Sequence, residues 1–441
     1  MDVDVIVLGL GPGGEDVAGR LAEMGLQVAG VEGNLVGGEC PYWGCIPSKM
    51  MIHAANRLTE ARRAGASVTP DWSRLARRIR DEATDDWDDK VAADRFTGKG
   101  GHLVRGHGRI TGPGEVTVGE QVIRARRGIV IASGSQAVVP PIEGLAGTPY
   151  WINRQAIETE AVPESLVVLG GGAIGVELAQ VFARFGAEVT VVEAADRLVA
   201  LEEPEAGALI AKAFAEDGIQ VLTGTKASGI RYEDGRFTVL GPDVSAEKLL
   251  VATGRRVDLK ALGVGAIGLD ESARAVPVDE RMRAADGVWA LGDAVGKGAF
   301  THMAMYHADI IVKEILGLSG HEAEYHAVPR VTFTDPEVGA AGLTEAQARE
   351  KGLDVNIGYT DLAESSRGWI AQAQGFVKLV AADGVLVGAT SAGPSGGEVL
   401  SMLTLAVHAR IPVRRLREMI YAYPTFHRAV SAALAELPPD R

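Results

Sequence analysis

Two cysteines, Cys40 and Cys45, are the only ones in the 441-residue chain, and they lie five positions apart. A chain cross-linked for extracellular life would spread several cysteine pairs over long loops. A bond that closes so short a loop also removes little entropy from the unfolded chain, so it would add little stability. The pair is therefore predicted to do chemistry rather than to cross-link the chain for stability.

The residues after the second cysteine favour the same interpretation. Cys45 follows Gly44 at the expected start of a helix, where the positive end of the helix dipole lowers the pKa of a thiol. Lys49 lies one helical turn further on, so its side chain is expected on the same face as Cys45. A thiol with a lowered pKa ionises readily, which again favours a chemical role for Cys45.

A glycine-rich turn lies close to the N-terminus. The apolar run Val3–Leu8 leads directly into a G-x-G-x-x-G spacing, a helix-like stretch follows to Gly25, and a second apolar run ends in an acid. In this layout the backbone amides at the helix start can approach a pyrophosphate, and the acid can bind a ribose. The residues concerned are Gly9, Gly11, Gly14 and Glu32.

The same layout recurs in the middle of the chain, with Gly170, Gly172, Gly175 and Glu193. In both copies the acid lies 23 residues after the first glycine. Each copy is followed by an apolar strand that ends in a similar tripeptide, first Ala132-Ser133-Gly134 and later Ala252-Thr253-Gly254. The repeat predicts two dinucleotide sites.

The predicted fold is α/β, with two Rossmann-like dinucleotide-binding domains and a third, α+β unit that begins near His326. The first copy takes longer to reach its tripeptide than the second, so it carries an insertion, and this insertion contains the cysteines. The third unit mixes strand-like runs at Phe376–Val380 and Val385–Thr390 with a helical stretch at Val399–His408.

Composition excludes some classes of partner. With 44 basic and 58 acidic residues the net charge is −14, which repels phosphate backbones and anionic lipids. No apolar run approaches the roughly 20 residues that cross a bilayer, and the first residues lack the basic end of a secretory signal. We expect a cytoplasmic protein with no nucleic-acid or membrane partner.

Taken together, these residues resemble the two-dinucleotide flavoprotein disulfide reductases, the group that includes dihydrolipoamide dehydrogenase, glutathione reductase and mercuric reductase. The most specific match is the stretch Gly37–Lys49, which contains both cysteines. Further matches are Asp293 in Leu-Gly-Asp, the region Thr334–Glu337, and Tyr423-Pro424-Thr425 near the end.

The resemblance implies a domain order and a dimer. Residues 1–148 and 259–323 would form a discontinuous FAD-binding domain, 149–258 an NAD(P)-binding domain, and 324–441 the dimerisation domain. The protein would be a homodimer in which the tail of one subunit completes the site of the other.

The resemblance also implies roles for individual residues. Cys40 and Cys45 would form a redox-active disulfide that passes electrons between FAD and an external acceptor. Cys45 would be the thiolate beside the flavin and Cys40 the interchange thiol that faces the substrate. Lys49 and Glu177 would pair near the flavin. Asp293 would bind the ribitol or phosphate part of FAD. The further cofactor-binding positions are Gly38, Gly108, Ser133, Gly134 and Thr301 for FAD, and Ile174 and Gly254 for the nicotinamide nucleotide. No metal site is expected.

The acid–base residues depart from the family pattern. The usual motif is His-Pro-Thr with a glutamate three residues after the threonine, whereas this chain has Tyr423-Pro424-Thr425 and Arg428. Tyr423 is a poor base at neutral pH because a phenol titrates near 10, although it can position a ligand. His427 is a candidate substitute, with an ordinary interface histidine as the alternative.

The choice between the two nicotinamide nucleotides depends on Glu193. A carboxylate about 4 Å from a 2′-phosphate costs a few kcal/mol, which favours NAD(H). Arg197, four residues later, keeps NADP(H) as the second candidate, and a surface role for this arginine is the alternative.

The leading functional hypothesis is an FAD-dependent NAD(P)H:disulfide or dithiol oxidoreductase, similar to dihydrolipoamide dehydrogenase but with an atypical small-molecule substrate. The alternative is a reductase of quinones, metal ions or oxygen, and a third hypothesis is a nucleotide-binding regulator without turnover.

Overall fold

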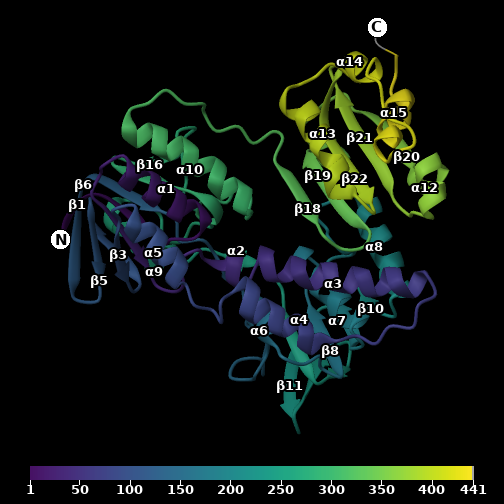
Figure 1. Cartoon of the computed structure of the whole chain (residues 1–441), viewed down its shortest axis with the longest axis horizontal. Coiled ribbons are helices and arrows are strands. Elements are labelled where there is room, and N and C mark those ends of the chain that lie inside the picture. Colours follow the sequence, from purple (N-terminus) through teal and green to yellow (C-terminus); the bar gives the residue numbers. More distant parts are fainter. Residues whose placement is uncertain (440–441) are drawn as a thin grey trace. The chain divides into compact units, whose positions relative to one another are not determined.

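The computed structural model describes residues 1–439, which fold into two compact units (Figure 1). The first unit combines Met1–Met50, Ser73–Val138 and Gly254–Glu324. The second combines Met51–Trp72, Val139–Thr253 and the residues from Tyr325 onward. The chain therefore passes between the units several times before it ends.

The first unit is built on an eight-stranded sheet with the order β16-β17-β6-β1-β2-β3, in which β5 pairs with β6 and with β4. Strands β17, β6, β1, β2 and β3 are parallel. The apolar runs of the central strands β6, β1 and β2 are buried, as is typical of parallel strands covered on both faces. The strands are β1 (Asp2–Leu8), β2 (Val28–Glu32), β3 (His102–Arg105), β4 (Gly108–Gly112), β5 (Glu115–Val118), β6 (Gln121–Ile131), β16 (Arg283–Ala285) and β17 (Val288–Ala290).

Two long helices of this unit lie side by side in Figure 1, α1 (Pro12–Glu23) and α10 (Thr301–Leu316). Pro12 begins α1, where its missing N–H costs nothing and its fixed φ favours the helix. The other elements are α2 (Glu39–Tyr42), α4 (Trp72–Arg78), α5 (Lys90–Gly98) and α9 (Leu259–Leu262), together with the short antiparallel pair β7 (Gln136–Ala137) and β15 (Arg255–Arg256). Helix α3 (Cys45–Arg63) starts in this unit and ends in the other.

The second unit contains a four-stranded parallel sheet with the order β10-β9-β8-β14. Its connectivity repeats that of the first unit, because β8 pairs with β9 and β14 as β1 pairs with β2 and β6. These elements are β8 (Ser165–Leu169), β9 (Glu188–Val192), β10 (Gln220–Leu222), β14 (Lys248–Val251), α6 (Asn153–Glu158), α7 (Ala173–Arg184) and α8 (Pro204–Glu216), with a small antiparallel sheet of β11 (Gly229–Glu233), β12 (Arg236–Leu240) and β13 (Val244–Ala246).

The last part of the chain forms a five-stranded antiparallel sheet with the order β18-β19-β22-β21-β20. Helix α13 (Gly396–His408) packs on β19 and β22, and α15 (His427–Glu436) packs on β20 and β21. Buried aliphatic side chains of the helices and strands form one core. The elements are β18 (Pro329–Thr332), β19 (Glu337–Gly342), β20 (Asn356–Asp361), β21 (Phe376–Ala382), β22 (Val385–Gly393), α11 (Glu345–Glu350), α12 (Ser366–Ala371) and α14 (Val413–Arg417). The predicted fold class, two Rossmann-like folds and an α+β part, is confirmed.

Candidate active site

The first glycine of each predicted nucleotide turn occupies a conformation that suits glycine. Gly9 has φ +93° and Gly170 has φ +110°. A Cβ atom at either position would lie 2.4 Å from a carbonyl oxygen of the neighbouring strand end, that of Ala132 or that of Ala252. The turns are therefore tied to the strands β6 and β14 beside them.

The other two glycines of each turn differ in what surrounds them. A Cβ at Gly14 would lie 2.1 Å from the Gly9 carbonyl oxygen, and one at Gly175 would lie 2.0 Å from that of Gly170. A Cβ at Gly11 or Gly172 would meet nothing within 4 Å. Space is thus kept open where the helix begins, which is where a pyrophosphate group approaches backbone amides.

The acidic residue at the end of the strand that follows each glycine turn accepts hydrogen bonds from the backbone in and near that turn. The two carboxylate oxygens of Glu32 accept the N–H groups of Leu10 and Asn34, both at 2.7 Å. Those of Glu193 accept the N–H groups of Gly171 at 2.5 Å and Ala195 at 2.6 Å. Both carboxylates are fixed beside the turn, in the position from which a ribose hydroxyl is bound in this type of site.

Other predicted FAD-binding residues surround the first turn. A Cβ at Gly38 would lie 2.7 Å from the Gly11 Cα atom, so the loop before the cysteines lies against the open glycine. Ser133 and Gly134 follow the end of β6, with the backbone of Ser133 beside Gly9. Gly108 begins β4 and packs against the side chain of Leu8.

Asp293 lies in a chain of polar contacts that the sequence did not predict. Ser135 Oγ donates to Asp293 Oδ2 at 2.5 Å, and Arg255 donates both to Ser135 Oγ at 2.9 Å and to the Ser135 carbonyl at 2.6 Å. Arg255 also lies 4.0 Å from the carboxylate of Glu39, which precedes the first cysteine. Both new residues directly follow glycines of the repeated tripeptides, and that position was the available signal.

His307 is a second residue that sequence reasoning missed. Its side chain is completely buried in α10, and its Nδ1 atom accepts the N–H of Gly292 at 3.1 Å. Burial lowers the pKa of this imidazole to about 4, so the ring is neutral and can act as the acceptor. His307 therefore helps to hold the turn that carries Asp293.

The two cysteines are free thiols, with Cys40 half-buried and Cys45 exposed at the first position of α3. Cys45 Sγ lies 3.5 Å from the hydroxyl oxygen of Thr301, the first residue of α10. A hydrogen bond from Cys40 lowers the pKa of Cys45 to about 6, and Thr301 and the charge of Lys49 act in the same direction. The same interaction, with burial, raises the pKa of Cys40.

The two cysteines therefore differ in ionisation. Cys45 is a thiolate at neutral pH and Cys40 is a thiol that hydrogen-bonds to it. Such a polarised pair is suited to two-electron redox chemistry, because the thiolate is stabilised before the reaction starts.

The residues predicted for the nicotinamide nucleotide lie mainly in the second unit. Ile174 is exposed in the first turn of α7, and Glu177 is buried one turn further, where its Oε1 atom accepts the N–H of Phe333 at 2.8 Å. Lys49 and Gly254 belong to the first unit. The predicted pairing of Lys49 with Glu177 stays a prediction.

Tyr423 and His427 lie near the C-terminal end of the second unit. The side chain of Tyr423 is exposed and its hydroxyl donates to Ser366 Oγ at 3.1 Å. His427 is the first residue of α15. Neither lies in the same unit as the cysteines, so their predicted role also stays a prediction.

Within residues 1–439 no group of three or more His, Cys, Asp or Glu side chains is arranged to hold a metal ion. Among the same residues, no helix is long and apolar enough to cross a bilayer.

Comparison with known proteins assigns the chain to a family. Residues 3–308 match the model of the pyridine nucleotide-disulphide oxidoreductases, and residues 328–434 match the dimerisation domain of the same family. The chain is 33% identical over 462 residues to a dihydrolipoyl dehydrogenase of Thermus scotoductus, with 98% of this chain and 97% of the relative covered. It is 32% identical over 455 residues to a mercuric reductase of Acidithiobacillus ferrooxidans, covering 98% and 82% respectively.

A solved structure gives the same result. The Cu(II) complex of the HOCl-induced flavoprotein disulfide reductase RclA from Escherichia coli superposes with a TM-score of 0.86 at 26% identity, over 99% of both chains. This chain belongs to the pyridine nucleotide-disulphide oxidoreductases, which are FAD-dependent enzymes that use NAD(P)H. The resemblance inferred from the cysteine stretch and the repeated turns is thereby confirmed.

Proposed function

We propose that this protein is an NADH-preferring, FAD-dependent disulfide or dithiol oxidoreductase that uses Cys40 and Cys45 and acts on a small molecule other than lipoamide or glutathione. The observation that carries the proposal is the opposite ionisation of the two cysteines, with Cys45 a thiolate held at 3.5 Å from Thr301. The dimerisation domain supports a homodimer.

The residues present fit the two nucleotides. The open Gly11 at the start of α1 and the fixed carboxylate of Glu32 provide the two contacts that a dinucleotide such as FAD needs, and Asp293 is held nearby in the same unit by Ser135. FAD bound there would accept the two electrons of NADH and supply them to the cysteine pair. Gly172 and Glu193 provide the equivalent contacts for the nicotinamide nucleotide.

The protein residues would then complete the exchange with the substrate. With both cysteines reduced, Cys40 attacks one sulfur of the substrate disulfide, forms a mixed disulfide and releases the first product thiol. Cys45 attacks Cys40, restores the Cys40–Cys45 disulfide and releases the second thiol. Each cycle oxidises one NADH and reduces one disulfide, and the two leaving thiolates take up two protons.

The preference for NADH rests on Glu193 and Arg197. The carboxylate of Glu193 is fixed beside the turn, where it would repel a 2′-phosphate. Arg197 folds back into its own loop and donates to the carbonyl oxygens of Ala200 at 2.8 Å and Glu202 at 3.4 Å. An arginine engaged in this way does not compensate the repulsion.

A second candidate function, the reduction of a soft metal ion, is favoured by one observation. The chain has Tyr423 and Arg428 where the family's proton-transferring His and Glu stand. Disulfide reduction requires protons for the product thiols, whereas reduction of Cu(II) to Cu(I) requires none. Thiolates also bind the soft product ion Cu(I) well. The similarity to a mercuric reductase and to the Cu(II) complex of RclA agrees with this candidate.

The test is an anaerobic titration of the purified protein with NADH, with Cys45→Ala as the control. We expect the long-wavelength charge-transfer band of a thiolate beside oxidised flavin in the wild type and no band in the variant. A wild type that is reduced without this band would exclude the disulfide mechanism. Reoxidation by small disulfides, quinones and Cu(II), compared side by side, then ranks the acceptors.

A further inference from the structure

Helix α7 presents one polar face to the loop Phe333–Pro336, which joins β18 to β19. Glu177, Gln180 and Arg184 lie at positions i, i+3 and i+7, so they share this face. Gln180 forms a two-way clamp, because its Oε1 atom accepts the N–H of Asp335 at 2.7 Å and its Nε2 atom donates to the Asp335 carbonyl at 2.9 Å. The Phe333 N–H donates to Glu177 Oε1, so the loop is held at two successive turns of the helix.

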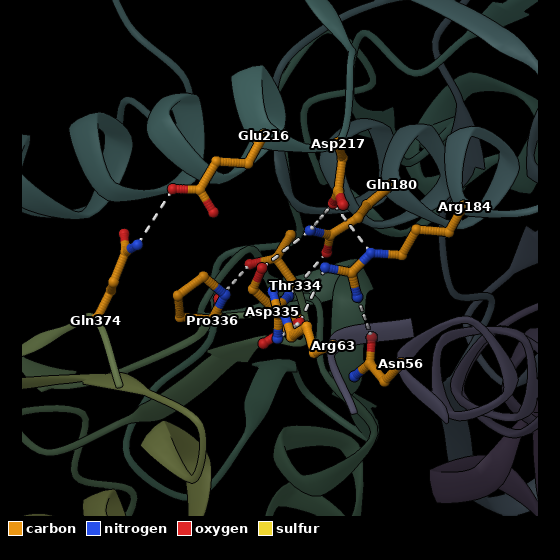
Figure 2. A network of polar contacts seen from close by, with 10 residues as sticks. All are labelled: Asn56, Arg63, Gln180, Arg184, Glu216, Asp217, Thr334, Asp335, Pro336 and Gln374. Carbon is orange, nitrogen blue, oxygen red and sulfur yellow. Dashed lines mark hydrogen bonds and ion pairs between the residues drawn. The ribbon is translucent and has the colours of Figure 1, made fainter. Parts of the chain in front are cut away.

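Arg184 continues this contact and uses every nitrogen of its guanidinium group. Nε donates to Asp217 at 2.9 Å, one terminal nitrogen donates to Asn56 Oδ1 at 2.7 Å, and the other donates to Asp335 at 2.9 Å. Figure 2 shows the guanidinium between these three partners. Its side chain is only 2% exposed, so the geometry is fixed by buried bonds.

Two arginines and two aspartates form the ion pairs of this network. Arg63 pairs with the same Asp335 oxygen at 3.2 Å, which gives two cations for the two anions Asp217 and Asp335. Arg63 is mostly exposed, whereas Arg184 is buried. Buried ion pairs such as those of Arg184 contribute little net stability compared with apolar packing, but they can specify one arrangement of the elements that they join.

The elements joined are those that the proposed reaction uses. Asn56 and Arg63 lie in the second half of α3, and the first two turns of this continuous helix carry Cys45 and Lys49. Helix α7 starts at the glycine turn proposed for the nicotinamide nucleotide and carries Glu177. The network therefore connects the helix of the cysteines, the helix of the nicotinamide turn and the loop between β18 and β19.

We infer that Gln180, Arg184 and Asp335 are positioning residues for hydride transfer. They hold α7, and with it Glu177 and the nicotinamide turn, against the second half of α3, where Asn56 and Arg63 lie. The inference rests on the proposed function, because it concerns the step between NADH and FAD. Displacement of reacting groups by about 1 Å lowers a rate by up to about 100-fold, so loosening this network slows the step without removing any group that touches the nucleotides.

The primary variant is Gln180→Met, which keeps the length of the side chain. It removes both bonds to Asp335 and the bond that Gln180 Nε2 donates to Asp217 at 2.9 Å. The matched control is Gln374→Met, the same chemical change at the edge of the same network. Gln374 donates to Glu216 of α8 at 3.1 Å (Figure 2), and no bond from it to α7 is described. Each full-length, FAD-loaded protein is mixed anaerobically with increasing NADH, and the loss of flavin absorbance is followed in time.

We expect Gln180→Met to lower the limiting rate constant of flavin reduction by about tenfold. The NADH concentration at half-saturation and the FAD content should stay within about twofold of wild type, and Gln374→Met should behave as wild type. Equal limiting rates in the two variants would overturn the inference. A change in NADH affinity alone would also overturn it, because it would assign Gln180 to binding.

A second variant keeps the test decisive if Gln180→Met does not fold. Asp335→Asn retains the shape of the side chain and removes the anion shared by Arg184 and Arg63, and the same limiting rate is measured. If the proposed function is wrong, the wild-type protein itself is not reduced by NADH. That outcome differs from a slow variant beside an active wild type, so the two failures can be distinguished.

Discussion

The hydroxyl of Thr301 lies 3.5 Å from the sulfur of Cys45, at the point where helices α10 and α3 both begin. This contact stabilises a negative charge on sulfur, because a hydroxyl donates to a thiolate more strongly than to a thiol. It places Thr301, which the sequence assigned to cofactor binding, at the redox pair itself.

The first prediction concerns this contact. Thiolate absorbance in the NADH-reduced enzyme should persist above pH 6 and disappear as the pH falls through the Cys45 pKa of about 6. Thr301→Val should move the midpoint upward by about one pH unit, because it removes one hydrogen bond to the charged form. Thr301→Ser keeps the hydroxyl and should titrate as wild type, and an unmoved midpoint in Thr301→Val would contradict the role of the hydroxyl.

The second prediction concerns nucleotide choice. Glu193→Gln removes the negative charge and keeps one of the two oxygens that accept the N–H groups of Gly171 and Ala195. We expect kcat/KM with NADPH to rise by about tenfold or more. Arg197→Met, as the comparison, should leave use of NADPH unchanged because this arginine is bonded within its own loop. Loss of NADPH use in Arg197→Met would show that the arginine does receive the phosphate.

The third prediction concerns stability at acid pH. The pKa of His307 is lowered by burial to about 4 in the folded chain and is about 6.5 in the unfolded chain, so the unfolded chain binds more protons between these values. The contribution is complete above pH 6.5 and is lost as the pH falls toward 4, on the order of 3 kcal/mol in total.

His307→Gln is the variant that tests this prediction. It offers an acceptor oxygen to the Gly292 N–H and does not titrate. Urea unfolding followed between pH 4 and pH 7 should show a shallower acid decline for the variant than for wild type. Parallel curves for the two proteins would assign the decline to other groups.

The fourth prediction concerns the missing proton-transfer pair. Tyr423 donates to Ser366 and is exposed in a single chain, so Tyr423→Phe should lower turnover by less than about threefold. The double change Tyr423→His with Arg428→Glu restores the family pattern and should raise the rate of dithiol oxidation near pH 8 by about 100-fold. Lipoamide and glutathione assays in both directions measure the effect. If the double variant is no faster than wild type, the departure at Tyr423 does not explain the choice of substrate.

Much of the fold could be predicted from local sequence pattern. The apolar runs before Gly9 and Gly170 indicate buried parallel strands, because a glycine turn and a helix-like stretch follow each of them. The repeat of this pattern predicted two Rossmann-like folds. The cysteine stretch indicated the family, because its residues are contiguous in the chain and can be recognised without a structure.

The rest depended on contacts between distant segments. Ser135 and Arg255 are 120 positions apart. His307 binds the Gly292 N–H only because the chain brings α10 next to the turn that contains Gly292. The Gln180–Asp335 clamp likewise joins a helix to a loop 155 positions later. The spacing of residues within a short stretch of sequence does not predict such pairs. The domain boundaries, the individual site roles and the cytoplasmic location stay predictions.

The contrast between the second and third glycines of each turn separates two kinds of selection on this chain. At Gly14 and Gly175 an added methyl group meets a carbonyl oxygen, so such a change harms folding whether or not a nucleotide is present. At Gly11 and Gly172 the same methyl group meets nothing, so a screen for folded protein would accept alanine there. Only a screen for nucleotide binding would reject alanine at these two positions. Both screens, run on one library of variants, would therefore identify the nucleotide sites even though the electron acceptor is not known.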